Sequence, residues 1–199
     1  MLIGLTGGIA CGKSAAAKAF KEHGCRVIDV DEIVRNEVLV DAAVMDVAVA
    51  RWGGAVVDVA EGGGRRILNR GRVADIVFGN PAERKWWEGV VHPRVGAIWR
   101  ARVAEDAAAM WVLEIPLLFE AGLEKGFDFI VCVGANPAVQ LERALARGMT
   151  RAQADQRIAS QLPLDTKISS AHAILWNDGD RAFLSAQVAG LTAWLRAGS

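Results

Sequence analysis

One stretch near the start of the chain, residues 7–14, constrains its fold more than any other. It reads Gly-Gly-Ile-Ala-Cys-Gly-Lys-Ser and fits the phosphate-binding pattern G-x-x-x-x-G-K-S/T. The apolar residues 2–6 before it predict a buried strand, and residues 15–23 after it are mostly good helix formers, followed by the helix stop Gly24. A strand, a glycine-rich turn and a helix in this order predict an α/β fold that binds a nucleoside triphosphate.

Each part of this turn has a chemical task. Glycines allow successive backbone N–H groups to point inward as an anion nest, and the helix N-terminus adds the positive end of its dipole. Lys13 would bring a full charge to the β- and γ-phosphates, and the Ser14 hydroxyl would ligate Mg²⁺. The alternative is a chance glycine turn before an ordinary helix, which would not need the correct flanking elements. The residues expected to bind the nucleotide here are Gly8, Ala10, Cys11, Gly12, Lys13, Ser14 and Ala15.

Composition limits the class of protein and its partners. The 199 residues are 52% hydrophobic, enough for one sizeable domain with a small insertion. The 23 basic and 23 acidic residues cancel, which argues against nucleic acid as the main partner. The three cysteines lack metal-ligand spacing and no apolar run is long enough to span a membrane, so we expect reduced thiols in a cytoplasmic protein. The oligomeric state stays open, with a monomer favoured.

Acidic side chains follow two of the expected strands. Residues 26–31 form a second strand that ends in Asp29 and Asp31, and a βαβ crossover makes it parallel to the first. The carboxyl ends of parallel strands form the ligand crevice, so either aspartate could accept a hydroxyl proton or hold Mg²⁺ through water. Asp31 is the preferred base and Asp29 the second choice, although Asp31 could instead cap the following helix. Glu114 ends the buried strand 110–115 and resembles a Walker B acid that holds Mg²⁺.

The middle of the chain is expected to be mainly helical. Residues 32–51 have helical spacing, with Asp41 as the cap of a second helix, and a glycine-rich loop then surrounds residues 56–59, whose pairing as a hairpin stays open. The basic stretch 65–72 is either a solvated surface or a contact for a phosphate-bearing substrate. Asn80-Pro81 ends one helix and begins another, and His92-Pro93 follows it. His92 could be a helix-end cap or a substrate contact, and the residues alone favour the structural role.

The last third predicts a short helix-turn-helix, a strand and a closing helix. Arg143 and Arg147 lie four residues apart on one helix face, and Thr150 begins the next helix with a capping box. Such paired arginines resemble a kinase lid that excludes water, or are solvent-exposed without a ligand. A short strand at 173–175 ends near Asn177. The final helix, about 180–196, is expected to bury Phe183, Val188, Leu191, Trp194 and Leu195.

Taken in order, several of these segments resemble the dephospho-coenzyme A kinase family. The two family-specific parts are His92-Pro93 and the Pro-Leu-Leu-Phe-Glu run at 116–120. The remaining matching positions are residues 5–9, 27–31 and 77–81, together with Arg70, Arg143, Arg147, Arg157, Gln161, Lys167, Asn177 and Gly179.

The resemblance implies a three-layer α/β/α fold of the P-loop NTPase class, similar to nucleoside monophosphate kinases, with a five-stranded parallel sheet. It divides the chain into a nucleotide-binding core (1–31, 108–137 and 171–199), a helical substrate-binding insertion (32–107) and a lid (138–170). The implied reaction transfers the γ-phosphoryl group of ATP, with Mg²⁺, to the 3′-hydroxyl of dephospho-CoA, the final step of coenzyme A synthesis.

The resemblance also implies roles for individual residues. Asp31, seconded by Asp29, would be the base, with Lys13 and Arg143 as the other catalytic residues. Ser14 and Glu114 would hold the metal. ATP would be bound by the loop with Arg143, Arg147 and Asn177, and the acceptor by Asp31, Arg70, Phe78, His92 and Leu117.

Two loop residues depart from the family, which usually has Gly and Ser where this chain has Ala10 and Cys11. We expect Ala10 to keep a negative φ, because a side chain penalises positive φ. We expect the helix N-terminus to lower the pKa of the Cys11 thiol, which suggests sensitivity to oxidation. Competing readings are another small-molecule or nucleoside monophosphate-type kinase, or a nucleotide switch. The chain has no Asn-Lys-x-Asp guanine motif, and its acids and lid arginines favour an enzyme.

Overall fold

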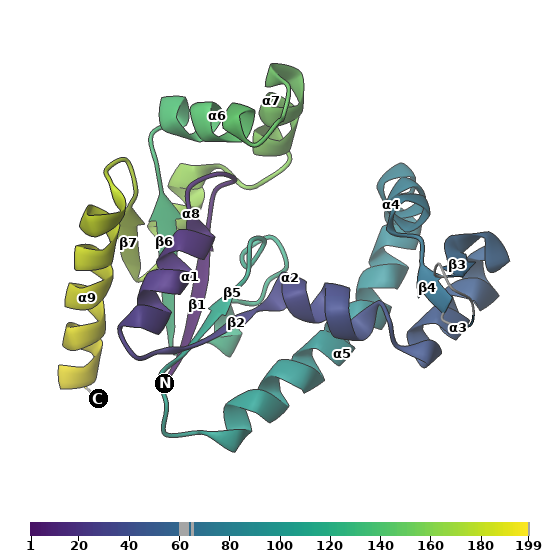
Figure 1. Cartoon of the computed structure of the whole chain (residues 1–199), viewed down its shortest axis with the longest axis horizontal. Helices are drawn as coiled ribbons and strands as arrows, with labels where there is room; N and C mark the ends of the chain where they lie inside the picture. Colours follow the sequence, from purple (N-terminus) through teal and green to yellow (C-terminus); the bar gives the residue numbers. More distant parts are fainter. Residues whose placement is uncertain (60–63, 65, 199) are drawn as a thin grey trace. The chain divides into compact units, whose positions relative to one another are not determined.

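In the computed structural model, which describes residues 1–59, 64 and 66–198, the chain divides into two units (Figure 1). The first comprises Met1–Asp29 and Asp106–Ser199, and the second comprises Val30–Glu105. Each unit has its own helices and strands.

A five-stranded sheet forms the centre of the first unit. Its strands are β1 (Leu2–Gly7), β2 (Arg26–Asp29), β5 (Trp111–Glu114), β6 (Phe129–Gly134) and β7 (Ala173–Trp176), in the order β2-β5-β1-β6-β7. Every neighbouring pair is parallel. This confirms the predicted α/β fold with a five-stranded parallel sheet, and it brings the carboxyl ends of all five strands to one edge.

Helices cover both faces of this sheet because side chains alternate along β1. Ile3 and Leu5 point to one face, where they pack in a fully buried core with α1 (Lys13–Glu22) and α9 (Arg181–Ala197). On the opposite face, Gly4 leaves room for Leu118, and α8 (Leu164–Ser170) covers the sheet (Figure 1). The layered arrangement follows from a strand that is apolar on both sides.

The buried face of α9 differs in part from the prediction. Val188 and Leu195 are buried and Leu191 packs against the core as expected, but Phe183 is 51% exposed and Trp194 is 64% exposed. The buried residues follow the helical spacing Leu184, Val188, Thr192, Leu195. Phe183 and Trp194 are large and apolar, but the position of a residue on the helix, and not its size, decides whether its side chain faces the core.

Between β6 and β7 lie the helices expected to form a lid. They are α6 (Pro137–Ala146) and α7 (Arg151–Ala159), followed by α8. Asn136 caps α6, with Pro137 in its first turn, and Thr150 and Gln153 form the predicted capping box of α7. A short 3₁₀ helix, η3 (Glu124–Gly126), precedes β6.

The second unit consists of helices and one small hairpin. Its elements are α2 (Val30–Ile33), the π-helix η1 (Val34–Val38), α3 (Ala42–Trp52), η2 (Gly54–Val56), β3 (Val57–Val59), β4 (Arg66–Leu68), α4 (Arg70–Gly79) and α5 (Pro81–Glu105). Asp41 caps α3 as predicted, its Oδ1 accepting from the Val44 N–H at 3.0 Å. β3 and β4 pair antiparallel, which resolves the open question of a hairpin. Gly62, Gly63 and Arg65 of the predicted loop and basic stretch lie outside the described residues.

The long helix α5 corrects one prediction. It continues through Pro93 to Glu105, so His92 is an exposed residue within a helix and not a helix-end cap. Proline removes one N–H donor inside a helix. The Arg94 guanidinium donates to the Val90 carbonyl oxygen at 2.8 Å in the same turn. The aromatic rings of Trp52, Trp86 and Trp87 pack nearby with centroids 5.1 to 6.0 Å apart, which secures the start of α5 against α3.

Within the described part of the chain, no helix has both the length and the apolar character to cross a bilayer.

Candidate active site

The phosphate-binding loop joins β1 to α1 as the sequence predicts. Gly12 precedes the first residue of α1 with φ 96°, in the left-handed region that favours glycine. The Lys13 ammonium folds back over the loop and donates to the carbonyl oxygens of Gly7 at 3.2 Å and Gly8 at 3.0 Å. The loop therefore carries a full positive charge at the N-terminus of a helix, an arrangement suited to an anion.

Asn177 and Arg143 support the far side of the loop. Asn177, only 6% exposed, donates through Nδ2 to the Cys11 carbonyl oxygen at 2.8 Å. A Cβ on Gly12 would lie 2.1 Å from the same nitrogen, so only glycine fits there. The Arg143 guanidinium, from α6, donates to the Asn177 carbonyl oxygen at 2.8 Å. Two predicted nucleotide-binding residues thus lie beside the loop.

Ser14 and Glu114 form the oxygen-rich part of the site. The Ser14 hydroxyl donates to Glu114 Oε1 at 2.8 Å, although 100 residues separate the two in sequence. Glu114 ends β5 and is 8% exposed, and the β2–β5 register pairs it with Asp29. Hydroxyl and carboxylate oxygens are hard ligands of the kind that Mg²⁺ prefers, so these residues fit a magnesium ion.

Ala10 and Cys11 depart from the predictions made for them. Ala10 has φ 58°, not a negative φ, and is the sole non-glycine residue with a positive φ among those the structure describes. Its methyl group packs in a small core with Ala144 of α6 and Ala154 of α7. The left-handed conformation costs about 1–2 kcal/mol, and burying the methyl group recovers about 0.8 kcal/mol of it.

Cys11 is buried in the structure. Its side chain is fully shielded from solvent, and this burial raises the pKa of the Cys11 thiol despite the opposing charge of Lys13. The predicted lowering of the pKa is therefore wrong, because burial outweighs both the charge of Lys13 and the hydrogen bonds to the thiol. A buried thiol with a raised pKa forms little thiolate, so the suggested oxidative sensitivity loses its physical basis.

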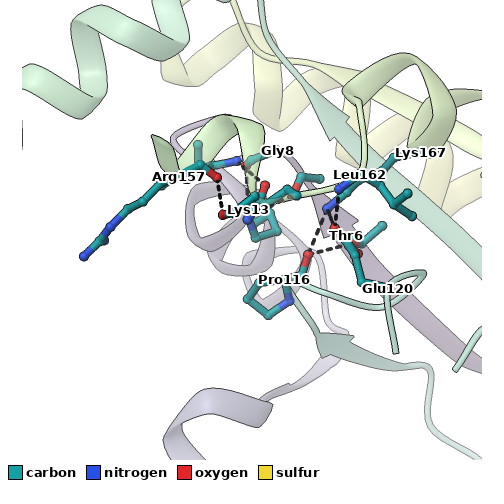
Figure 2. A network of polar contacts seen from close by, with 12 residues as sticks. Thr6, Gly8, Lys13, Pro116, Glu120, Arg157, Leu162 and Lys167 are labelled. Atoms are coloured by element: carbon teal, nitrogen blue, oxygen red, sulfur yellow. Dashed lines mark hydrogen bonds and ion pairs between the residues drawn. The ribbon is translucent and has the colours of Figure 1, made fainter. Parts of the chain in front are cut away.

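A buried ion pair lies beneath the loop (Figure 2). The ammonium of Lys167, fully buried in α8, lies 2.7 Å from Glu120 Oε1 and donates to the Pro116 carbonyl oxygen at 3.2 Å. Thr6 Oγ1 donates to the same carbonyl at 3.3 Å, and the Leu162 N–H donates to Glu120 Oε1 at 3.0 Å. This network ties the end of β1, the loop after β5 and the start of α8 together.

The charge state of Glu120 follows from these contacts. Burial by itself raises the pKa of the carboxyl, but hydrogen bonds from Lys167 and the backbone outweigh it and leave the pKa below its ordinary value. Glu120 is therefore ionised at neutral pH and forms a true ion pair with Lys167.

The remaining predicted residues of the first unit lie at its surface. Ala15 is exposed in the first turn of α1, Arg147 is exposed at the end of α6, and Leu117 is 40% exposed in the loop after β5. Arg157 of α7 is also exposed, and its side chain points away from Gly8 and Lys13 in Figure 2.

Asp31, Arg70, Phe78 and His92 belong to the second unit. Asp31 lies in the first turn of α2, and Phe78 is 79% exposed on α4. Arg70 and Phe78 line a largely apolar pocket of about 180 Å³ together with Val34, Leu39, Leu68, Val73, Ala74, Val77 and Trp87. An apolar pocket beside a guanidinium can take a ligand that is partly apolar and partly anionic.

Gln140, which lies beside the loop, was not predicted from the sequence. Gln140 of α6 is 5% exposed and donates through Nε2 to the Ile9 carbonyl oxygen at 2.9 Å and to Cys11 Sγ at 3.0 Å. Gln161, predicted only through the family resemblance, accepts from the Ile9 N–H at 3.1 Å. The sequence does hold one indication of Gln140: it lies four residues before Ala144, on the buried side of α6, where a polar side chain needs a hydrogen-bond partner.

Comparison with known proteins identifies the family of this chain. The sequence model of the family described as "Dephospho-CoA kinase" matches residues 1–182. A Dephospho-CoA kinase of Synechococcus sp. (strain CC9902) is 41% identical over 184 residues, covering 89% of this chain and 88% of the relative. One of Thermosynechococcus vestitus is 40% identical over 190 residues, covering 94% and 90%.

Solved structures share the fold over almost the whole length. The crystal structure of TT1252 from Thermus thermophilus superposes with a TM-score of 0.82 at 29% identity, covering 98% of this chain and 97% of that one. The chain belongs to the dephospho-CoA kinase family of P-loop kinases.

Proposed function

We propose that this protein transfers the γ-phosphoryl group of ATP to the 3′-hydroxyl of the ribose of dephospho-CoA, giving CoA and ADP. Family membership supports the acceptor. The observation that carries the phosphoryl-transfer part is the loop itself, with Lys13 across it and Ser14 bonded to Glu114 at 2.8 Å. Phosphoryl transfer depends mainly on positioning and charge neutralisation, and these residues supply both.

The nucleotide would bind with its phosphates in the loop. Backbone N–H groups of the loop and the first turn of α1 would contact the phosphate oxygens, and Lys13 would turn from the loop carbonyls to the β- and γ-phosphates. Arg143 and Arg147 of α6 would add positive charge from the lid, while Asn177 keeps the Cys11 peptide in place. We assign residues 138–170 this lid role.

Ser14 and Glu114 would hold a magnesium ion, which when bound supplies positive charge to the phosphates. Among the residues with described positions, no group of three or more His, Cys, Asp and Glu side chains could hold a metal ion. Mg²⁺ usually keeps several waters and binds proteins through one or two side chains plus substrate phosphates, so two protein ligands suffice.

The acceptor would bind to the helical unit, residues 32–107 of the proposed domain division. Supporting this is the pocket that Arg70 and Phe78 line, where a guanidinium adjoins an apolar wall. His92 and Leu117 would contribute further contacts. Asp31, seconded by Asp29, would accept the proton of the ribose hydroxyl as it attacks the γ-phosphorus.

A coupled ADP-release assay tests the function. Purified protein with ATP and Mg²⁺ should turn over with dephospho-CoA and not with AMP, CMP, shikimate or gluconate. Lys13→Ala should abolish turnover, while Lys18→Ala, an exposed lysine on the same helix, should leave it unchanged. Turnover with a different acceptor, or none with dephospho-CoA, would refute the proposed function.

Paired substitutions test the base. Asp31→Asn should lose turnover while keeping the affinity for ATP, and Asp29→Asn should have the smaller effect. The reverse order would identify Asp29 as the base. The cytoplasmic location and the monomeric state also stay predictions, and size-exclusion chromatography with light scattering measures the latter.

A further inference from the structure

Two glutamine side chains from the lid region hold the peptide groups on both sides of Ile9. The Ile9 N–H donates to Gln161 Oε1 at 3.1 Å, and the Ile9 carbonyl oxygen accepts from Gln140 Nε2 at 2.9 Å. Gln140 lies on α6 and Gln161 lies two residues beyond the end of α7. Ile9 is thus held at its donor and at its acceptor by residues 152 and 131 positions away in sequence.

The loop is shaped to admit these side chains. A Cβ on Gly8 would lie 2.5 Å from Gln140 Nε2, so a larger residue at Gly8 would displace the glutamine. Gln140 is 5% exposed, and the same nitrogen approaches Cys11 Sγ at 3.0 Å. A buried amide that reaches two loop residues has little freedom to move, which makes it a firm support.

The loop needs such support because its backbone is strained. Ala10, directly after Ile9, has a φ of 58°, in the left-handed region that a side chain disfavours. A strained segment persists only when its surroundings hold it. N–H groups that bind an anion are effective when they are already oriented, since no energy is then spent on arranging them.

We infer that Gln140 and Gln161 are positioning residues of the nucleotide site: they hold Ile9 from both sides and keep the loop in its phosphate-binding shape. They act through the loop backbone and do not themselves contact the phosphates. The affinity for ATP therefore depends on the packing of the lid helices against the loop. This inference rests on the proposed ATP site and is independent of the identity of the acceptor.

The variants Gln140→Met and Gln161→Met test it, because methionine keeps the length and volume of glutamine but removes the hydrogen bonds. Each should weaken equilibrium binding of ATP, measured calorimetrically without acceptor, by about fivefold, the size expected for one neutral hydrogen bond. The KM for dephospho-CoA should stay the same. Hydrogen exchange of the Ile9 amide should accelerate in Gln161→Met, which removes its acceptor.

Gln156→Met is the matched control, an exposed glutamine on α7 that should bind ATP like the wild type. Wild-type ATP affinity in folded Gln161→Met, or an equal loss in Gln156→Met, would overturn the inference. Gln161 is only half-buried, so this variant decides the matter even if Gln140→Met fails to fold. A failure of the proposed function would give a different result: the wild-type protein would bind ATP but would not phosphorylate dephospho-CoA.

Discussion

Removing the buried ammonium of Lys167 should destabilise the first unit strongly. The Lys167 side chain is fully buried and its Glu120 partner is 17% exposed, with 2.7 Å between Nζ and Oε1. Lys167→Met leaves the carboxylate in place without its counter-ion and deprives the Pro116 carbonyl of one of its two donors. Breaking a buried pair from one side typically costs about 3–5 kcal/mol. Because Glu120 retains some exposure, we expect about 3 kcal/mol, at the lower end of that range.

The double variant Lys167→Met/Glu120→Gln separates the lost charge pair from the lost packing. The amide oxygen that this variant carries at position 120 can still accept from the Leu162 N–H, and no charge stays buried. We therefore expect the double variant to be more stable than Lys167→Met, with a coupling energy of about 1–2 kcal/mol between the two positions. Urea unfolding followed by circular dichroism gives these values. Arg151→Met, which breaks the exposed Arg151–Asp155 pair, serves as the control and should cost less than about 1 kcal/mol.

The pH dependence gives a second, independent test. In the wild type the pKa of Glu120 is lowered, so its contribution to stability is present above the ordinary value of 4.5 and is lost as the pH falls through the lowered pKa. In Lys167→Met the main hydrogen-bond donor is gone and burial then raises the pKa of Glu120. The carboxyl of the variant is neutralised at a higher pH, so the stability difference from the wild type should narrow between pH 7 and pH 5. A loss below about 1 kcal/mol at pH 7, or a difference that widens on acidification, would refute this account of the pair.

Two further substitutions and one labelling experiment test the loop. Gly12→Ala should abolish ATP binding, because its Cβ would meet Asn177 Nδ2 at 2.1 Å, whereas Gly122→Ala, also at positive φ but with open space around it, should bind ATP normally. Ser14→Ala should lower kcat by about tenfold or more and raise the Mg²⁺ concentration needed for half-maximal turnover. A Mg²⁺ titration measures both quantities, and wild-type values for both would contradict the metal-binding role of Ser14. Cys11 should resist iodoacetamide in the folded protein at pH 8, since burial raises the pKa of its thiol, and rapid labelling detected by mass spectrometry would contradict its burial.

The parts of the fold that sequence reasoning predicted well depend on short stretches of chain. The strands of the parallel sheet are apolar runs bounded by turns, and the capping residues Asp41, Asn136 and Thr150 mark their helices because each bonds within its own first turn. The loop at 7–14 belongs to the same group, since its pattern, its strand and its helix are contiguous. The error at Phe183 shows the limit, because which side of a helix is buried depends on what packs against it.

Ala10 shows why the rest of the site could not be predicted from the sequence. The penalty on a positive φ is a property of one residue, and it argued for a negative φ. The packing that offsets this conformational cost comes from contacts of the Ala10 methyl group with Ala144 and Ala154, more than a hundred residues away. These contacts exist only once α6 and α7 have folded over the loop. The same separation applies to Ser14 with Glu114 and to Ile9 with Gln140 and Gln161, each pair joined by a hydrogen bond between distant segments. A loop pattern can therefore predict a phosphate site from contiguous residues, whereas the residues that hold the loop in shape depend on how α6 and α7 pack, which becomes visible only in three dimensions.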